Sequence, residues 1–219
     1  MPFHLRPSAP TAADAILCGD PGRALMIAQA LLTKPRMSNH HRGLWGYWGV
    51  TERGAELTVQ ATGIGGPSAV TVLGELGGLG VRRAIRIGTC SVDAPTPELG
   101  SGLVVAAAVA ADGTSLALGA APGSTLAPDP ALTAALASAS GAPELTVLSR
   151  DLQPAESSAG DPRPTDLQTA ATLRWAERHG VAAAAALTVA RARGRRLEDE
   201  PLDGALLALA RSAARVLGG

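Results

Sequence analysis

The chain has 219 residues, of which 46% are hydrophobic, 17% are charged and only 2% are aromatic, and its formal net charge is zero. This length favours one large domain that buries enough apolar surface to fold without a disulfide or a structural metal. A net charge of zero gives no field for binding a polyanion, which argues against nucleic-acid and membrane-surface roles. The apolar content argues against disorder.

No apolar run is long enough to cross a membrane, and the first ten residues lack the apolar region of a signal peptide, so we expect a cytoplasmic protein. Cys18 and Cys90 lie among small apolar or hydroxyl residues, which favours reduced, packed thiols over a disulfide. His40 and His41 are adjacent and have no cysteine or carboxylate at ligand spacing, so we expect no metal site.

Apolar segments of strand length alternate with helical patterns along the chain, which is typical of a mostly parallel sheet covered by helices. The expected strands, in chain order, span residues 15–18, 57–61, 84–88, 103–108, 145–148 and 182–189. The expected helices span residues 21–32, 66–79, 130–139, 165–180 and 202–217. Residues 120–130 and 156–164 are interpreted as loops, and the charge run over 193–200 as a solvated loop. The sequence therefore predicts an α/β fold, a single domain over 1–219 with three α/β/α layers and a mixed, mostly parallel central sheet.

Two glycine-rich turns each follow an expected strand and open a helix, at 19–23 and at 62–68. Such turns present unpaired backbone N–H groups to an anion. Arg23 adds a guanidinium to the first turn, and a third strand ends in Arg86-Ile87-Gly88-Thr89. Because ligands bind at the carboxyl edge of open α/β sheets, these groups indicate a site for a phosphate dianion.

Each signal alone has an ordinary structural explanation. An arginine after a Gly-Pro turn is usually a solvated helix residue, and a glycine-rich segment is often only a tight turn. A dinucleotide site is disfavoured because the third glycine of that fingerprint falls on Ser68.

Together the segments are more specific. They are Phe3-His4-Leu5, GDPGR at 19–23, His41-Arg42, TGIGGPS at 62–68, RIGT at 86–89 and ADGTS at 111–115. In this order and spacing the chain resembles the nucleoside phosphorylases of the hexameric purine nucleoside phosphorylase and uridine phosphorylase type, and uridine phosphorylase most closely. The resemblance implies a pentosyltransferase in which phosphate attacks C1′ of a nucleoside and releases the free base and ribose 1-phosphate. It implies phosphate as a co-substrate and no cofactor.

The resemblance also implies residue roles. It places Gly19, Arg23, Arg86 and Thr89 around the phosphate, with Arg42 supplied by a neighbouring subunit. His4 of the neighbour would lie beside the ribose 5′-hydroxyl, with Phe3 behind it, and Ile64 would lie beside the nucleoside. A site shared in this way implies a homo-oligomer, at least a dimer and, by the family pattern, a hexamer.

The second half of the chain departs from the family at the ribose. Alignment without gaps from His179-Gly180 sets Asp166, Leu167 and Gln168 on the Glu-Met-Glu that family members carry beneath the ribose. Gln168 can still bind hydroxyl groups, but it lacks the charge that strengthens those bonds and favours an oxocarbenium ion. We therefore expect slower chemistry.

The base-binding positions depart as well. Gln153 replaces the aromatic residue that stacks on the base, and Arg191 stands where purine phosphorylases place a proton-donating aspartate. Arg86, Thr89, Gln168 and Arg191 are the expected catalytic groups. Three interpretations remain open: a nucleoside phosphorylase for a uridine-like or purine substrate, a nucleosidase that uses water, and a non-catalytic relative that binds a nucleotide or phosphosugar.

Overall fold

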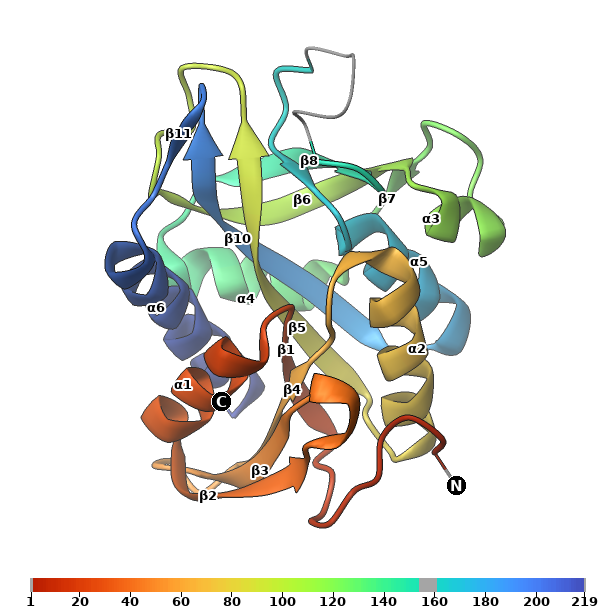
Figure 1. Cartoon of the computed structure of the whole chain (residues 1–219), viewed down its shortest axis with the longest axis vertical. Coiled ribbons are helices and arrows are strands. Elements are labelled where there is room, and N and C mark those ends of the chain that lie inside the picture. The colour runs from red at the N-terminus through yellow and green to blue at the C-terminus, as the bar shows by residue number, and fades with distance from the viewer. Residues whose placement is uncertain (1, 154–160, 219) are drawn as a thin grey trace.

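The structure is a computed structural model that describes residues 2–153 and 161–218. Its centre is a run of parallel strands in the spatial order β4, β1, β5 and β10 (Figure 1). These strands span Asp14–Cys18 (β1), Glu56–Ala61 (β4), Arg83–Val92 (β5) and Ala182–Ala192 (β10). Each contains the strand expected from the sequence, and the alanine-rich run after Gly180 is confirmed as a buried strand, β10.

An antiparallel pair extends the sheet beyond β4 and was not expected from the sequence. It comprises β2 (Leu32–Asn39) and β3 (Gly46–Thr51). The β2–β3 register shifts twice, between Thr33 and Arg36 and between Met37 and Asn39, so β2 shows no regular alternation of polar and apolar residues. The expected helix end at Leu32 is accordingly one residue too long, because Leu32 begins β2.

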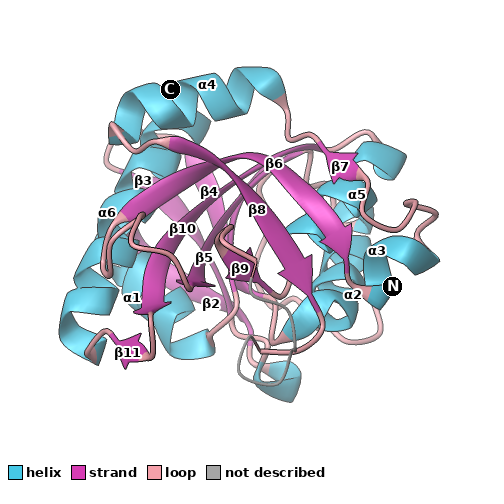
Figure 2. Cartoon of the chain, turned by 90° about the horizontal axis from the view of Figure 1, so that it is seen from above, coloured by secondary structure: helices cyan, strands magenta, loops and turns pink. Residues whose placement is uncertain are grey.

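The other half of the sheet curls back on itself. Strand β10 pairs with β6 (Gly102–Ala111), β6 pairs with β8 (Glu144–Arg150), and the short β9 (Thr165–Asp166) bridges β8 to β5 (Figure 2). Since β5 also pairs with β10, these strands form a closed ring. Strand β7 (Thr125–Leu126) lies within the segment expected to be a loop and pairs with β6.

Helices cover both faces of the sheet, which confirms the predicted three-layer architecture. On one face lie α1 (Pro21–Leu31), α4 (Pro130–Ser140) and α6 (Asp199–Leu217), whose buried residues form one apolar cluster with the strands. On the other face lie α2 (Gly65–Gly78) and α5 (Thr169–His179), which pack against each other and form a second cluster (Figure 1). The short α3 (Gly113–Ala117) and the 3₁₀ turn η1 (His41–Gly43) complete the described helical elements.

Two boundaries correct the sequence prediction. The segment expected to begin a helix at Thr165 first forms β9, and α5 starts only at Thr169. The charge run expected to be a solvated loop instead contains the strand β11 (Arg195–Arg196), paired with the end of β10, and the first turn of α6. The acidic residues Asp199 and Glu200 lie in that first turn, where negative charge is favourable to the helix dipole.

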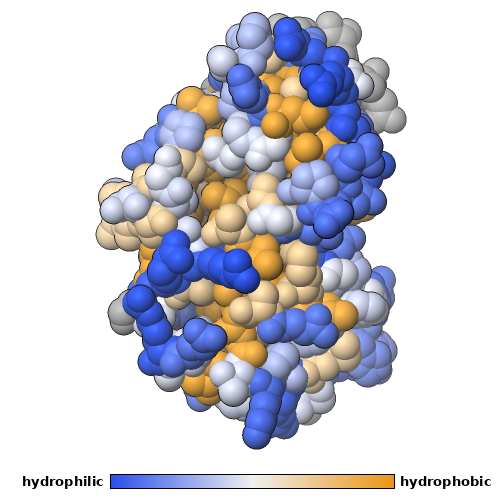
Figure 3. Space-filling model, turned by 90° about the vertical axis from the view of Figure 1, so that its left-hand side faces the viewer, coloured by the Kyte–Doolittle hydropathy of each residue, from blue (hydrophilic) through white to orange (hydrophobic). Residues whose placement is uncertain are grey.

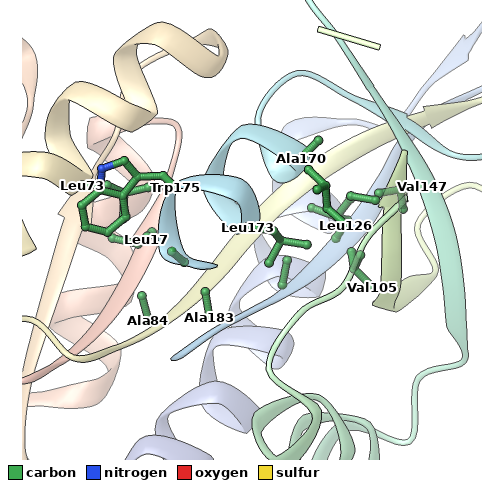
Figure 4. Packing of buried hydrophobic residues seen from close by; sticks show 14 of the residues in the cluster. Leu17, Leu73, Ala84, Val105, Leu126, Val147, Ala170, Leu173, Trp175 and Ala183 are labelled. Carbon is green, nitrogen blue, oxygen red and sulfur yellow. The ribbon is translucent and has the colours of Figure 1, made fainter. Parts of the chain in front are cut away.

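Small side chains let the layers approach closely. Ala84 and Ala183 are register partners on neighbouring strands beneath α5, and Trp175 of α5 lies beside Leu73 of α2 (Figure 4). A Cβ atom on Gly77 would lie 2.8 Å from the Trp175 ring, so the glycine makes room for the indole. Trp175 is therefore a large packing residue between two helices.

The surface in Figure 3 shows separate groups of hydrophilic residues with hydrophobic ones between them. Within the described part of the chain, none of the helices is both long and apolar enough to cross a membrane.

Replacing Trp175 by alanine should lower the free energy of unfolding by about 3–5 kcal/mol, because a buried indole would leave a cavity between α2 and α5. Urea denaturation followed by circular dichroism measures this loss. Val70→Ala, at a half-buried position of α2, is the milder control. A loss no larger than that of the control would contradict the packing role.

Candidate functional site

The site begins where two glycine-rich turns meet at the carboxyl ends of β1 and β4. A Cβ atom on Gly19 would lie 3.2 Å from the carbonyl oxygen of Gly63, so the turns approach closely. In the first turn the Asp20 side chain accepts a hydrogen bond from the backbone N–H of Arg23 and caps α1. In the second, Gly63 and Gly65 have φ values of +75° and +80°, which strongly favour glycine.

Arg86 lies on β5, and its side chain is nearly buried, with 6% of the residue exposed. Its Nη1 donates to Oε1 of Gln168 at 2.8 Å, and its Nη2 donates to Oδ2 of Asp166 at 3.0 Å. Its Nε donates to the hydroxyl of Thr169 at 3.3 Å. A guanidinium has five N–H donors, so two remain for a ligand. A Cβ on Gly88 would lie 2.7 Å from Nη2, so glycine is needed there to seat the guanidinium.

Asp166 is buried with its carboxylate fully engaged. Besides Arg86, it accepts hydrogen bonds from the hydroxyls of Ser149 and Thr169 and from the backbone N–H groups of Gln168 and Thr169. These donors replace the water that the carboxylate loses on burial. Asp166 therefore holds the start of α5 against β5 and β8.

Gln168 links Arg86 to the second glycine turn. Its Nε2 donates to the carbonyl oxygens of Gly63 at 2.7 Å and Gly65 at 3.1 Å. Its Oε1 accepts from Arg86 and from the hydroxyl of Thr62. Both N–H groups of the amide and one side of its oxygen thus have protein partners, and the single Thr62 proton is shared between Gln168 and the carbonyl oxygen of Cys18. The side chain therefore fixes the turn instead of standing free to meet ribose.

These elements surround a cavity of about 460 Å³. Ten of the residues expected at the site line it: Gly19, Arg23, Ile64, Arg86, Thr89, Gln153, Asp166, Leu167, Gln168 and Arg191. Sequence reasoning missed further lining residues, among them Asp20, Ser91 and Arg196. Asp20 was named only within the first glycine-rich turn, with no role at the site, and Arg196 was recognised only as part of a charge run. The pairing of β11 with β10 brings Arg196 to the cavity, and no local pattern signals that pairing.

Three expected site residues do not line the cavity of their own chain: Phe3, His4 and Arg42. Phe3 is 75% exposed, and the backbone N–H groups of Phe3, His4 and Leu5 donate to the carboxylate of Glu75 on α2. Burial opposes the charge of Glu75, but these hydrogen bonds outweigh it and lower the pKa of Glu75. The N-terminal segment is thus fixed on α2, away from the cavity.

Both cysteines are free and buried, as the sequence predicted. Cys18 ends β1 beside the first turn, and Cys90 lines the cavity from β5. Burial raises the pKa of the Cys18 thiol to about 12, with a further contribution from the nearby charge of Asp20, and burial also raises the pKa of Cys90. In the described segments no group of three or more His, Cys, Asp or Glu side chains is placed to hold a metal ion.

A family model described as the phosphorylase superfamily matches residues 14–151, which is more than half of the chain. The chain belongs to the phosphorylase superfamily. This confirms the resemblance drawn from the motifs.

Sequence relatives in this superfamily match less than half of the chain. A DeoD-type purine nucleoside phosphorylase of Oceanobacillus iheyensis is 41% identical over 92 residues, 41% of this chain and 39% of the relative. The uridine phosphorylase of Escherichia coli (strain K12) is 42% identical over 102 residues, 47% of this chain and 40% of the relative. The chain thus spans about two-fifths of the length of the curated relatives it matches.

The fold extends much further than the sequence similarity. The crystal structure of uridine phosphorylase from Vibrio fischeri ES114 superposes with a TM-score of 0.83, covers 94% of this chain and 92% of the other, and shares 20% identity. The superfamily fold is therefore present over nearly the whole chain, including the second half, where the site residues depart most from the family pattern.

Replacing Gln168 by glutamate should destabilise the protein although it restores the family residue. A carboxylate would face the carbonyl oxygens of Gly63 and Gly65 and leave them unpaired, at a cost of about 1–3 kcal/mol for each. Thermal unfolding measures the loss. Gln153→Glu is the matched control, since it makes the same change at an exposed position of the same cavity. Equal melting temperatures for the two variants would show that the Gln168 amide does not hold the turn.

The native thiols should resist alkylation by iodoacetamide at pH 8, because the raised pKa keeps Cys18 protonated, and should react fully in denaturant. The folded state holds this proton more tightly than the unfolded state, so stability should fall as pH rises from about 9 towards 12. Mass spectrometry of labelled protein measures the first effect. Rapid labelling of the native protein would contradict the burial of both thiols.

Proposed function

We propose that the protein is a nucleoside phosphorylase that cleaves the N-glycosidic bond of a nucleoside with inorganic phosphate. The observation that carries the proposal is Arg86, held by Asp166 and Gln168 at the carboxyl ends of parallel strands with two N–H donors left for an anion. The glycine turn at Gly19 and the N-terminus of α1 lie on the same cavity and offer backbone donors. Arg86, Gly19, Arg23 and Thr89 would contact the phosphate.

In the proposed reaction a phosphate oxygen forms a bond to C1′ while the bond from C1′ to the base nitrogen breaks, and its electron pair leaves with the base. The phosphate is both nucleophile and counter-ion to the positive charge that develops on the sugar, so catalysis consists mainly of positioning and electrostatics. Gln168 cannot add a negative charge beneath the sugar, and its amide is already used by the glycine turn. We therefore expect a slower reaction than a glutamate at this position would support.

The charge balance of the phosphate site supports a second subunit. Asp166 offsets the charge of Arg86, and Asp203 lies 3.5 Å from the guanidinium of Arg23. The two arginines of one chain therefore leave little net positive charge for a dianion. Arg42, which lies in η1 with φ +57° and outside its own cavity, would add the missing cation from a neighbour. His4 and Phe3 would reach the ribose in the same way, in a homo-oligomer of at least two chains.

A binding protein without turnover is the second candidate. The hydrogen bonds of Gln168 favour it, because they remove the expected ribose contact from the cavity. Such a protein would hold a phosphorylated ligand on Arg86 without cleaving a glycosidic bond.

Purified protein should release base from at least one of uridine, thymidine, inosine and adenosine only when phosphate is present, with ribose 1-phosphate as the second product. Chromatography of the bases and a phosphosugar assay measure both products. Ribose in place of ribose 1-phosphate would indicate a nucleosidase. No release from any of the four at high enzyme concentration, together with a phosphate-dependent rise in melting temperature, would favour the binding protein.

Arg86→Lys should remove most of the phosphate-dependent rise in melting temperature, because lysine keeps the charge beside Asp166 but loses the forked donors. Arg53→Ala, at an exposed turn between β3 and β4, is the control. An unchanged phosphate response in Arg86→Lys would show that the phosphate binds elsewhere.

A further inference from the structure

The cavity wall contains more positive than negative side chains. Four arginines line it, against two aspartates, Asp20 and Asp166. Three of the arginines have a carboxylate within ion-pair distance: Arg23 with Asp203 at 3.5 Å, Arg86 with Asp166 at 3.0 Å and Arg196 with Asp199 at 2.6 Å. The guanidinium of the fourth, Arg191, makes no hydrogen bond or ion pair with any of the described residues.

Arg191 is placed directly opposite another arginine. It is the register partner of Arg196 in the antiparallel β10–β11 hairpin, and both residues line the cavity. Like charges opposite each other on neighbouring strands destabilise a sheet. Asp199 offsets part of the charge on Arg196, and an anion between the two guanidiniums would offset the rest and supply Arg191 with the acceptor that it lacks.

This arginine pair is separate from the proposed phosphate site. A bulge between Val189 and Arg191 shifts the register of β10, so that Arg191 pairs with Ser91 of β5. The Arg86 guanidinium lies against Gly88. Ser91 lies three residues further along β5, and three residues span about 10 Å of a strand. In the proposed reaction phosphate would lie at the Arg86 end, so the Arg191 end is left for a second negative group, on the base of the nucleoside.

We propose that the cavity selects nucleosides whose base carries a negative charge at neutral pH, and that Arg191 and Arg196 bind this charge. The inference rests on the proposed phosphorylase function, in which phosphate occupies the Arg86 end. Charge recognition also suits a cavity whose described lining contains no aromatic side chain for stacking on a base. Charge-assisted hydrogen bonds from a guanidinium are about twice as strong as neutral ones and are directional.

Two matched pairs of nucleosides test the proposal, because each pair differs in the charge of the base. Orotidine adds a carboxylate to uridine, and xanthosine loses a proton near neutral pH whereas inosine does not. We expect the kcat/KM of phosphorolysis to be at least about tenfold higher for the charged member of at least one pair. Arg191→Gln should abolish the preference, and Arg195→Gln should retain it. Arg195 lies in the same hairpin but does not line the cavity.

Binding measurements separate this proposal from the proposed function. Calorimetry with the same nucleosides detects the preference for a charged base even if no nucleoside is cleaved. In that case the phosphorylase proposal fails, and the assignment of Arg191 and Arg196 to a negatively charged base is supported for binding alone. Equal activity and equal binding within both pairs, unchanged in Arg191→Gln, would overturn the inference and leave the phosphorylase intact. An Arg191-dependent preference for uridine 5′-monophosphate over uridine, without one for a charged base, would also overturn it.

Discussion

The buried ion pair between Arg86 and Asp166 is the interaction on which the site depends. Two charges removed from water lose several kcal/mol of solvation each, and their mutual attraction offsets this only when the remaining donors and acceptors are also satisfied. Here the hydroxyls of Ser149 and Thr169 donate hydrogen bonds to the Asp166 carboxylate, and Gln168 and Thr169 accept hydrogen bonds from the Arg86 guanidinium. The pair therefore ties the middle of β5 to β9 and, through Thr169, to the start of α5, and it holds only if these elements are in place.

Several glycines leave room for this ion pair or turn the backbone towards its partners. Gly88 leaves the space that the Arg86 guanidinium fills, and the turn at Gly63 and Gly65 turns its carbonyl oxygens towards the Gln168 amide. Gln168 in turn accepts from Arg86, so one chain of hydrogen bonds runs from the glycine turn through the amide to the ion pair. The glutamine is consistent with this chain, because an amide can donate to carbonyl groups and accept from a guanidinium at the same time, whereas a carboxylate can only accept.

The sequence could predict those parts of the fold whose pattern is local. Buried parallel strands are continuous apolar runs, and Asp20-Pro21 and Asp129-Pro130 are typical starts of helices, so these elements were placed within a few residues. Strands β2 and β3 were missed because neither shows the regular alternation of buried and exposed residues that marks a half-buried strand. Strand β9 was assigned to the helix that follows it, since two residues carry no periodicity and pair only in the folded sheet.

The same distinction applies to the site. The glycine turns and Arg86 could be found from the sequence, because a strand followed by a turn and a helix is a local arrangement. The partners of Gln168 could not, because they come from residues about a hundred positions away in the chain. Arg196 was missed for a similar reason: its place on the cavity depends on a hairpin whose second strand has two residues.

The scarcity of aromatic residues has a physical consequence for recognition. Trp175 is the one aromatic residue after position 48, and it is buried between α2 and α5 as a packing residue. Stacking is the usual means of holding a base of any identity, since every base has a π face. In the proposed phosphorylase, a cavity whose described lining within one chain offers no aromatic side chain would bind the base by hydrogen bonds and charge, and these depend on the particular groups that the base presents. Base selection in the proposed phosphorylase would then fall to polar residues that line the cavity, among them Gln153 and the arginines of the β10–β11 hairpin.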